Sequence, residues 1–116
     1  MNGYELCERA HIRLGIANED GFALQKNTSR RDLEFLNQIL SDLKIEPLKE
    51  LSDKIECAPN ITEAICCGIT MLISFCEGET EKNKHYTSVY NAKRAAVLGV
   101  AERVEDTIPT TEGGGI

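Results

Sequence analysis

Apolar residues recur at helical spacing in four segments of the chain, and this pattern predicts four helices. The predicted helices cover residues 3–14, 30–44, 61–77 and 80–98. The third is apolar on nearly every side, so other helices or other subunits must cover it all round. The fourth is amphipathic and basic. This pattern favours packing and assembly over chemistry.

Capping residues stand where the second and third helices are expected to begin. Ser29 is predicted to cap the second helix, and Asp32 to lie near its positive N-terminal end. Asn60 and Glu63 have the spacing of a capping box at the start of the third helix. Both helices are therefore expected to start at these polar residues.

Glycines follow three of the predicted helices and are expected to end them. Gly15 follows the first, Gly78 the third and Gly99 the fourth. Residues 45–59 contain Pro47 and end at Pro59, and their pattern fits either a short helix or an ordered loop.

The expected fold class is all-α: a small four-helix bundle-like domain with an extended C-terminal arm. The domain covers residues 1–99 and the arm residues 100–116. Pro109 and the glycines at 113–115 prevent a continuous helix through the arm, which is expected to be flexible when unbound. The predicted core consists of aliphatic and tyrosine side chains: Leu6, Ala10, Leu14, Leu33, Leu36, Ile39, Leu40, Leu43, Ile65, Ile69, Leu72, Ile73, Tyr86, Val89 and Tyr90.

Composition indicates one globular domain. The chain has 116 residues, of which 41% are hydrophobic and 28% charged, and this balance does not suit a disordered protein. Its net charge of −6 disfavours sequence-specific DNA binding as the main function. The basic charge is concentrated in residues 82–98, which contain no acidic residue.

The sequence predicts neither secretion nor a membrane span. Charged residues occupy the N-terminal segment where a signal peptide would need an apolar run. The longest apolar stretch, residues 64–76, is shorter than the roughly 20 residues that cross a bilayer. The five cysteines include no Cys-x-x-Cys pair, so we expect free thiols in a reducing cytoplasm.

No group of residues predicts catalysis, a metal site or a cofactor, and we expect no enzyme. His11 lies beside the apolar face of the first helix and is expected to be a partly buried structural residue, whereas His85 is expected to face water. Neither histidine has a catalytic motif around it. The pair Arg30 and Arg31 at the start of the second helix is expected to face water or to meet an acidic neighbour. The acidic residues between the third and fourth helices, which are expected to be solvated, are Glu77, Glu79 and Glu81.

Three segments resemble the head–tail adaptor (connector) proteins of tailed bacteriophages, including the tail accessory or packaged-DNA stabilisation factors. They are ELCERAHIRLGI at 5–16, RRDLEFLNQILSDLKI at 30–45 and AICCGITMLISFCEGETEKNKHYTSVYNAKRAAV at 64–97. The stretch from Arg103 to Pro109 is similar to the arm that follows the last helix in that family. Residues 46–60 match least.

This resemblance implies a virion structural protein that forms a homo-oligomeric ring, usually of twelve copies, at the head–tail junction. Such a ring binds beneath the portal protein, extends the DNA channel and presents a surface to the next tail or stopper component. Assembly would take place in the host cytoplasm, with non-specific contact to DNA passing through the channel and no role for a membrane. An acidic chain with one basic helix also offers unlike-charged faces for the contact between neighbouring subunits.

The fourth helix and the arm are the candidate interface. Its residues are Lys82, Lys84, Tyr86, Tyr90, Lys93, Arg94, Arg103, Val104, Ile108 and Pro109. The alternative reading is a small bacterial helical regulator or a partner-binding module without a phage role. The predicted loop between the first two helices is longer than the three or four residues of a DNA-reading helix-turn-helix, which disfavours the regulator.

Overall fold

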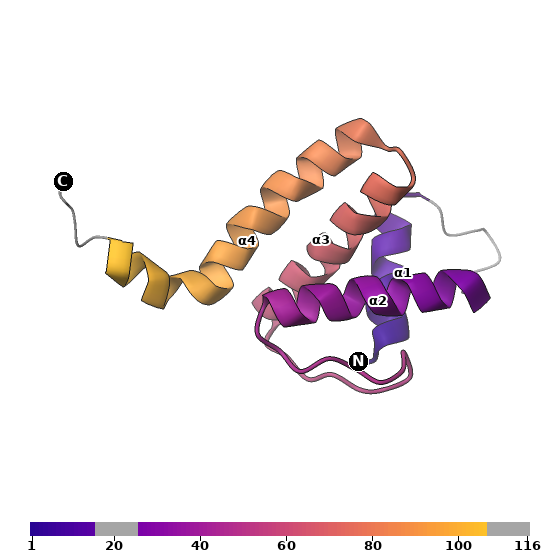
Figure 1. Ribbon diagram of the computed structural model, residues 1–116, viewed down its shortest axis with the longest axis horizontal. Helices are drawn as coiled ribbons and strands as arrows, with labels where there is room; N and C mark the ends of the chain where they lie inside the picture. The colour runs from indigo at the N-terminus through magenta and orange to yellow at the C-terminus, as the bar shows by residue number, and fades with distance from the viewer. Residues whose placement is uncertain (16–25, 107–116) are drawn as a thin grey trace.

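The computed structural model describes the backbone of residues 1–15 and 26–106, and the side chains of residues 1–15 and 29–99. Within those ranges the chain holds four α-helices and no strand (Figure 1). The helices are α1 (Gly3–Arg13), α2 (Lys26–Asp42), α3 (Pro59–Cys76) and α4 (Thr80–Asp106). The predicted all-α class is confirmed. The last part of the predicted arm, residues 107–116, lies outside the described residues.

The apolar helix α3 is the centre of the fold. It packs against α1, α2 and α4, which accounts for its lack of a continuous polar face (Figure 1). The approach to α2 is close, because a Cβ added at Gly68 would lie 2.7 Å from Cδ1 of Ile39. Glycine at this position therefore lets the two helices meet.

The third helix starts differently from the prediction. Ala58 is its N-cap, Pro59 occupies its first turn, and no side chain caps it. Glu63 instead accepts a hydrogen bond from Arg13 of α1, over 2.7 Å between Nη2 and Oε1. The predicted capping box of Asn60 and Glu63 is wrong, because the glutamate is used in a contact between helices. A capping box does form at α1, between Asn2 and Glu5.

The second helix begins at Lys26, before the residue predicted to cap it. Ser29 therefore lies inside the helix, and Asp32 lies in its second turn rather than at its N-terminal end. Asp32 is fully buried. Its carboxylate binds side chains instead of the free amides at a helix start.

The fourth helix continues through Gly99 to Asp106, so the prediction that Gly99 ends it is wrong. Glycine costs about 1 kcal/mol in a helix interior but does not break the hydrogen-bonding pattern. Gly99 is buried, and the predicted domain boundary at 99–100 falls within the helix. By contrast, the positive φ angles of Gly15 and Gly78 fit the glycine turns predicted after α1 and α3.

Residues 43–58 form the ordered loop that was one of the two predicted alternatives. The Asn37 side chain donates to the Leu48 carbonyl and accepts from the Leu48 amide, both over 2.8 Å. The Asp53 carboxylate accepts from two backbone amides of the same loop, and Leu51 is buried. A single antiparallel bridge joins Lys54 to Asn2.

The core agrees largely with the predicted set. The predicted core residues that are only partly buried are Leu33, Leu72, Tyr86 and Val89. The buried hydrophobic residues missing from that set are Cys7, Leu51, Ala64, Cys66 and Cys67. All five cysteines are free thiols, and three of them fill core positions.

Candidate functional site

The basic residues of α4 are distributed around the helix rather than along one exposed stripe. Lys84 is exposed, and Lys93 is half-buried. Lys82 Nζ donates to the Leu14 carbonyl over 3.2 Å, so this lysine also ties α4 to the end of α1. Lys82 is the one of these three lysines with a hydrogen bond and an ion pair to described residues, and Lys93 contributes a longer-range attraction to Glu63.

Arg94 and Tyr90 connect α4 to the C-terminal end of α2. Oδ2 of Asp42 accepts two hydrogen bonds, over 2.5 Å from the Tyr90 hydroxyl and 2.7 Å from Nε of Arg94. Burial alone would raise the pKa of Asp42, but these donors outweigh it and the pKa lies below its ordinary value. Burial and the neighbouring carboxylate raise the pKa of Tyr90. We call this group the Asp42 bridge.

The tyrosines lie on the inner side of α4, as the sequence predicts. Tyr90 is buried, and Tyr86 is half-buried against the core. Arg103 and Val104 are in α4, but their side chains are outside the described part, and Ile108 and Pro109 lie outside the described residues altogether. The six candidate residues whose side chains are described therefore lie on different sides of α4 and do not form one surface.

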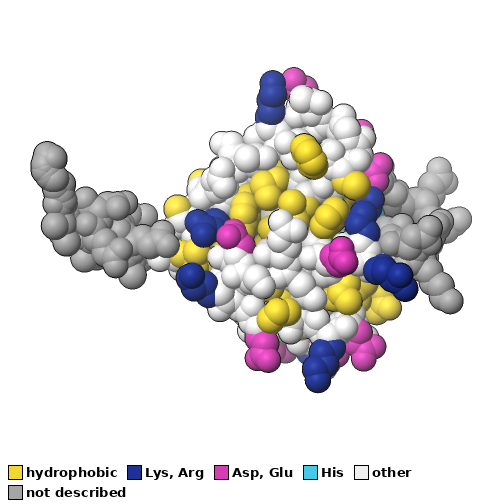
Figure 2. Space-filling view, in the orientation of Figure 1, with side chains coloured by type: hydrophobic (Ala, Val, Ile, Leu, Met, Phe, Trp, Pro, Cys, Tyr) yellow, Lys and Arg dark blue, Asp and Glu magenta, His cyan; other side chains and the backbone are white. Residues whose placement is uncertain are grey.

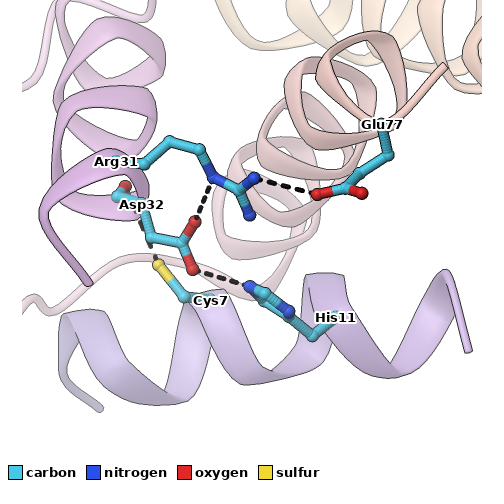
Figure 3. A network of polar contacts seen from close by, with 5 residues as sticks. All are labelled: Cys7, His11, Arg31, Asp32 and Glu77. Atoms are coloured by element: carbon cyan, nitrogen blue, oxygen red, sulfur yellow. Dashed lines mark hydrogen bonds and ion pairs between the residues drawn. The ribbon is translucent and has the colours of Figure 1, made fainter. Parts of the chain in front are cut away.

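A second polar assembly lies inside the protein, between α1 and α2. Nε2 of His11 lies 2.6 Å from Oδ2 of Asp32, and both side chains are buried (Figure 3). Nε of Arg31 donates to Oδ1 of the same carboxylate over 3.3 Å. Two cationic or hydrogen-bonding groups thus satisfy one buried carboxylate. We call His11, Arg31, Asp32 and Glu77 the interior network.

Arg31 extends the interior network to the turn between α3 and α4. Its Nη1 donates to Oε2 of Glu77 over 3.0 Å (Figure 3). Arg31 therefore meets acidic neighbours, which was the second of the two predicted alternatives. Its guanidinium also lies 5.7 Å from the ring centre of Phe35. Glu77 is exposed, as predicted, while pairing with Arg31. The network joins α1, α2 and the start of the α3–α4 turn.

The contacts of the interior network join helices to one another, which is the arrangement expected of a structural interaction. Cys7 lies beside it, with Sγ 3.9 Å from the Asp32 carbonyl oxygen. Burial and the Asp32 carboxylate raise the pKa of the Cys7 thiol, which keeps the sulfur protonated at neutral pH. Within the described ranges, no three His, Cys, Asp or Glu side chains are grouped to hold a metal ion.

A third polar cluster joins α1 to α3 near Cys67. The guanidinium of Arg13 binds Glu63 and also lies 3.5 Å from Sγ of Cys67. The hydrogen bond from Arg13 lowers the pKa of Glu63. Burial raises the pKa of the neighbouring Cys66 to about 11. These thiols are protonated at neutral pH and fill space.

The face between α2 and α4 is hollowed where it meets α3. One hollow of about 460 Å³ is lined by Gln38, Ile39, Ser41, Asp42, Met71 and Tyr90. A second, of about 210 Å³, is lined by Ser74, Phe75, Gly78, Glu79, Thr80 and Asn83. Figure 2 shows hydrophobic side chains gathered across the middle of this face, with charged side chains on both sides. Phe75 is 76% exposed.

Sequence reasoning missed both the interior network and this open face. The signal for the network was present, because Asp32 stands four residues before Leu36 and eight before Leu40, in register with the apolar stripe of α2. A charged residue in such a stripe requires a buried partner. The open face has no comparable signal, since it depends on the spacing between helices.

Helix α3 has the length and apolar composition of a membrane span, with a mean hydropathy of 1.4 over residues Pro59–Cys76. Half of that segment is buried inside the protein, and the central helix of a globular bundle meets the same criterion. No family model, no curated protein and no solved structure matches this chain.

Proposed function

We propose that this chain is a structural subunit of a tailed bacteriophage: a head–tail connector that forms a ring beneath the portal, extends the DNA channel and presents a surface for tail attachment. The observation that carries the proposal is the length of α4 relative to α3. Helix α4 has 27 residues and its packing partner α3 has 18, which correspond to about 40 Å and about 27 Å of helix. The longer helix therefore extends beyond its partner (Figure 1).

The outward face of α4 supports the same proposal. Neither α1 nor α2 packs its backbone against α4 in the described part of the chain, so α3 is its helical support. From Lys84 to Ala96, one side of α4 is consequently exposed and open to another molecule. A subunit of a ring needs such a surface for its neighbour and another for the portal.

Charge and polar contacts suit an assembly protein better than a catalyst. In the described polar clusters, ion pairs and hydrogen bonds join one helix to another. The cysteines beside two of these clusters are protonated thiols. The net charge of −6 would limit adhesion to DNA in the channel, while the basic side chains of α4 provide non-specific contacts. The partners proposed are the portal protein, the next tail component and further copies of this chain. The proposed location is the virion.

Attachment to portal rings tests the proposal. The portal should come from the phage whose genome encodes this chain, and the product should be separated from free subunits by sedimentation. The full chain should sediment with the portal. A chain lacking residues 107–116 keeps the whole of α4, should fold normally and should lose stable attachment if the arm binds the portal.

A charge-reversal pair sharpens this test. Lys84→Glu changes an exposed residue of α4, and Lys49→Glu makes the same change on the exposed loop between α2 and α3. The first should weaken ring formation on portals, most strongly at low ionic strength, because exposed charges act over longer distances there. The second should not. Failure of the full chain to bind any portal would favour the partner-binding module instead.

A further inference from the structure

Asn2 and Gly3 form the one Asn-Gly pair in the sequence. In such a pair the asparagine can lose its side-chain amide without an enzyme, because the backbone nitrogen of the next residue attacks the side-chain carbonyl carbon. Glycine favours this attack, since it has no side chain to hinder it. All other asparagines of the chain precede a residue with a side chain. The most reactive asparagine therefore stands at the start of α1.

The fold requires both residues of this pair. Oδ1 of Asn2 accepts a hydrogen bond from the Glu5 amide over 3.0 Å, and the Asn2 amide donates to Oε1 of Glu5 over 2.8 Å. These two bonds are the capping box of α1. Gly3 is buried, and a Cβ added there would lie 2.9 Å from the carbonyl oxygen of Leu51. Helix capping thus selects the asparagine, and close packing selects the glycine.

The folded geometry opposes the reaction that the sequence favours. Attack requires Cβ of Asn2 and the nitrogen of Gly3 to eclipse each other about the Cα–C bond of Asn2. At the observed ψ of 179° these two atoms are staggered. The Gly3 amide also donates to the Asp53 carbonyl over 3.4 Å, and the Glu5 amide holds the side chain of Asn2. The two reacting groups are therefore held out of position.

Backbone contacts on both sides of the pair prevent rotation about that bond. The Ile55 amide donates to the Met1 carbonyl over 2.8 Å, and the Tyr4 amide donates to the Leu51 carbonyl over 3.1 Å. Rotation about ψ of Asn2 would swing Met1 relative to α1 and would break at least one of these bonds. The reaction therefore requires the first residues to separate from the loop of residues 43–58.

We propose that Asn2 is a site of spontaneous deamidation that the folded chain protects, and that it reacts when the first turn of α1 opens from this loop. The Gly3 nitrogen gives up its proton and bonds to Cγ of Asn2. The bond from Cγ to Nδ2 breaks, and Nδ2 leaves with that proton as ammonia, so that a five-membered imide is formed. Water then opens the imide at Cγ, which gives aspartate, or at the main-chain carbonyl carbon, which gives isoaspartate. This inference goes beyond the connector role and does not depend on it.

The two products differ in their effect on the N-terminus. Aspartate is as good an N-cap as asparagine and keeps the main chain unchanged. Isoaspartate inserts an additional methylene into the main chain, which displaces Met1 relative to Ile55. Because the imide is the source of isoaspartate, this product distinguishes the proposed route from direct hydrolysis of the side-chain amide.

Peptide mass spectrometry of the full chain, incubated in mildly alkaline buffer, measures the loss of the Asn2 amide. A synthetic peptide of residues 1–12 is the reference, because so short a segment forms no stable helix alone. Deamidation should be about tenfold or more slower in the folded chain than in the peptide, since it waits for local opening. In urea that unfolds the chain, the two rates should become equal, and both samples should contain isoaspartate. Equal rates without urea, or a product free of isoaspartate, would overturn the inference.

A pair of glutamate variants tests whether the capping box provides the protection. Glu5→Ala removes the carboxylate of the box and should increase the rate in the folded chain severalfold. Glu8→Ala makes the same change on the same helix outside the box and should leave the rate unchanged. Circular dichroism establishes that both variants are folded. An unchanged rate in folded Glu5→Ala, or the same increase in both variants, would contradict the inference.

Discussion

The interior network and the Asp42 bridge attach α2 to the rest of the protein by opposite physical means. Asp32 is fully buried, and its partner His11 is nearly so. The side chains of Asp42 and Arg94 are each more than one third exposed. Water can replace the partners of Asp42 if the bridge opens, whereas the buried Asp32 carboxylate has no such substitute.

Because of this difference in burial, the two assemblies are expected to affect folding stability to different extents. A buried carboxylate makes folding depend on its partner, because an unpaired charge in the interior is expensive. A half-exposed bridge contributes little to stability, but it sets where α2 stands relative to α4. The interior network is therefore expected to matter more for the stability of the bundle, and the Asp42 bridge for the position of α2 relative to α4.

The largest effect is expected from removing the histidine of the interior network. His11→Ala removes one of the two side chains that the structure shows bonded to the buried Asp32 carboxylate, and Arg31 is the one that stays. The change should lower the free energy of unfolding by about 3–5 kcal/mol. Urea denaturation followed by circular dichroism measures this change. His85→Ala replaces the other histidine, which is exposed on α4, and should alter stability by less than about 0.5 kcal/mol. Equal effects at both positions would contradict the account of the interior.

A smaller difference should separate two leucines that face the two regions. Leu40 is fully buried between the helices, and Leu40→Ala should cost about 2–5 kcal/mol. Leu72 is partly buried, so Leu72→Ala should cost less than Leu40→Ala. The same denaturation experiment compares them. A larger loss at Leu72 would show that α3 is more enclosed in solution than this structure describes.

The smallest effect concerns acid stability and the Asp42 bridge. The pKa of Asp42 is lowered in the folded chain. Asp42 therefore contributes fully to stability at pH values above the pKa of this residue in the unfolded chain, which is near 3.8. That contribution is lost as the pH falls through the lower folded pKa. Stability should therefore decline on acidification below about pH 4, and Asp42→Asn should make this decline shallower. A steeper decline in the variant would contradict the assignment.

Periodicity was enough to predict the helical class and most of the core, since burial follows one face of each helix. Helix ends were less predictable, because capping rules consider only neighbours in sequence. Glu63 and Asp32 have the local chemistry of helix starts, yet each binds a residue from another helix. Gly99 resembles a stop signal, but the helix continues through it to Asp106.

The candidate interface was predictable in part. The anchoring of Tyr90 follows from its position on the apolar side of α4, and the structure places it there. The pairing of Arg94 with Asp42 joins residues 52 positions apart, which no local pattern indicates. The open face between α2 and α4 depends on the separation of two helices that both pack on a third, so it becomes visible only once the helices are arranged.

Electron microscopy of portal rings incubated with the full chain tests the connector role most directly. The account predicts an additional ring of subunits bound to one end of the portal, coaxial with its channel, with α4 of each subunit in contact with the next. It also predicts that this layer is missing when residues 107–116 are deleted. Portal rings that remain bare at saturating concentrations of the full chain would contradict the account.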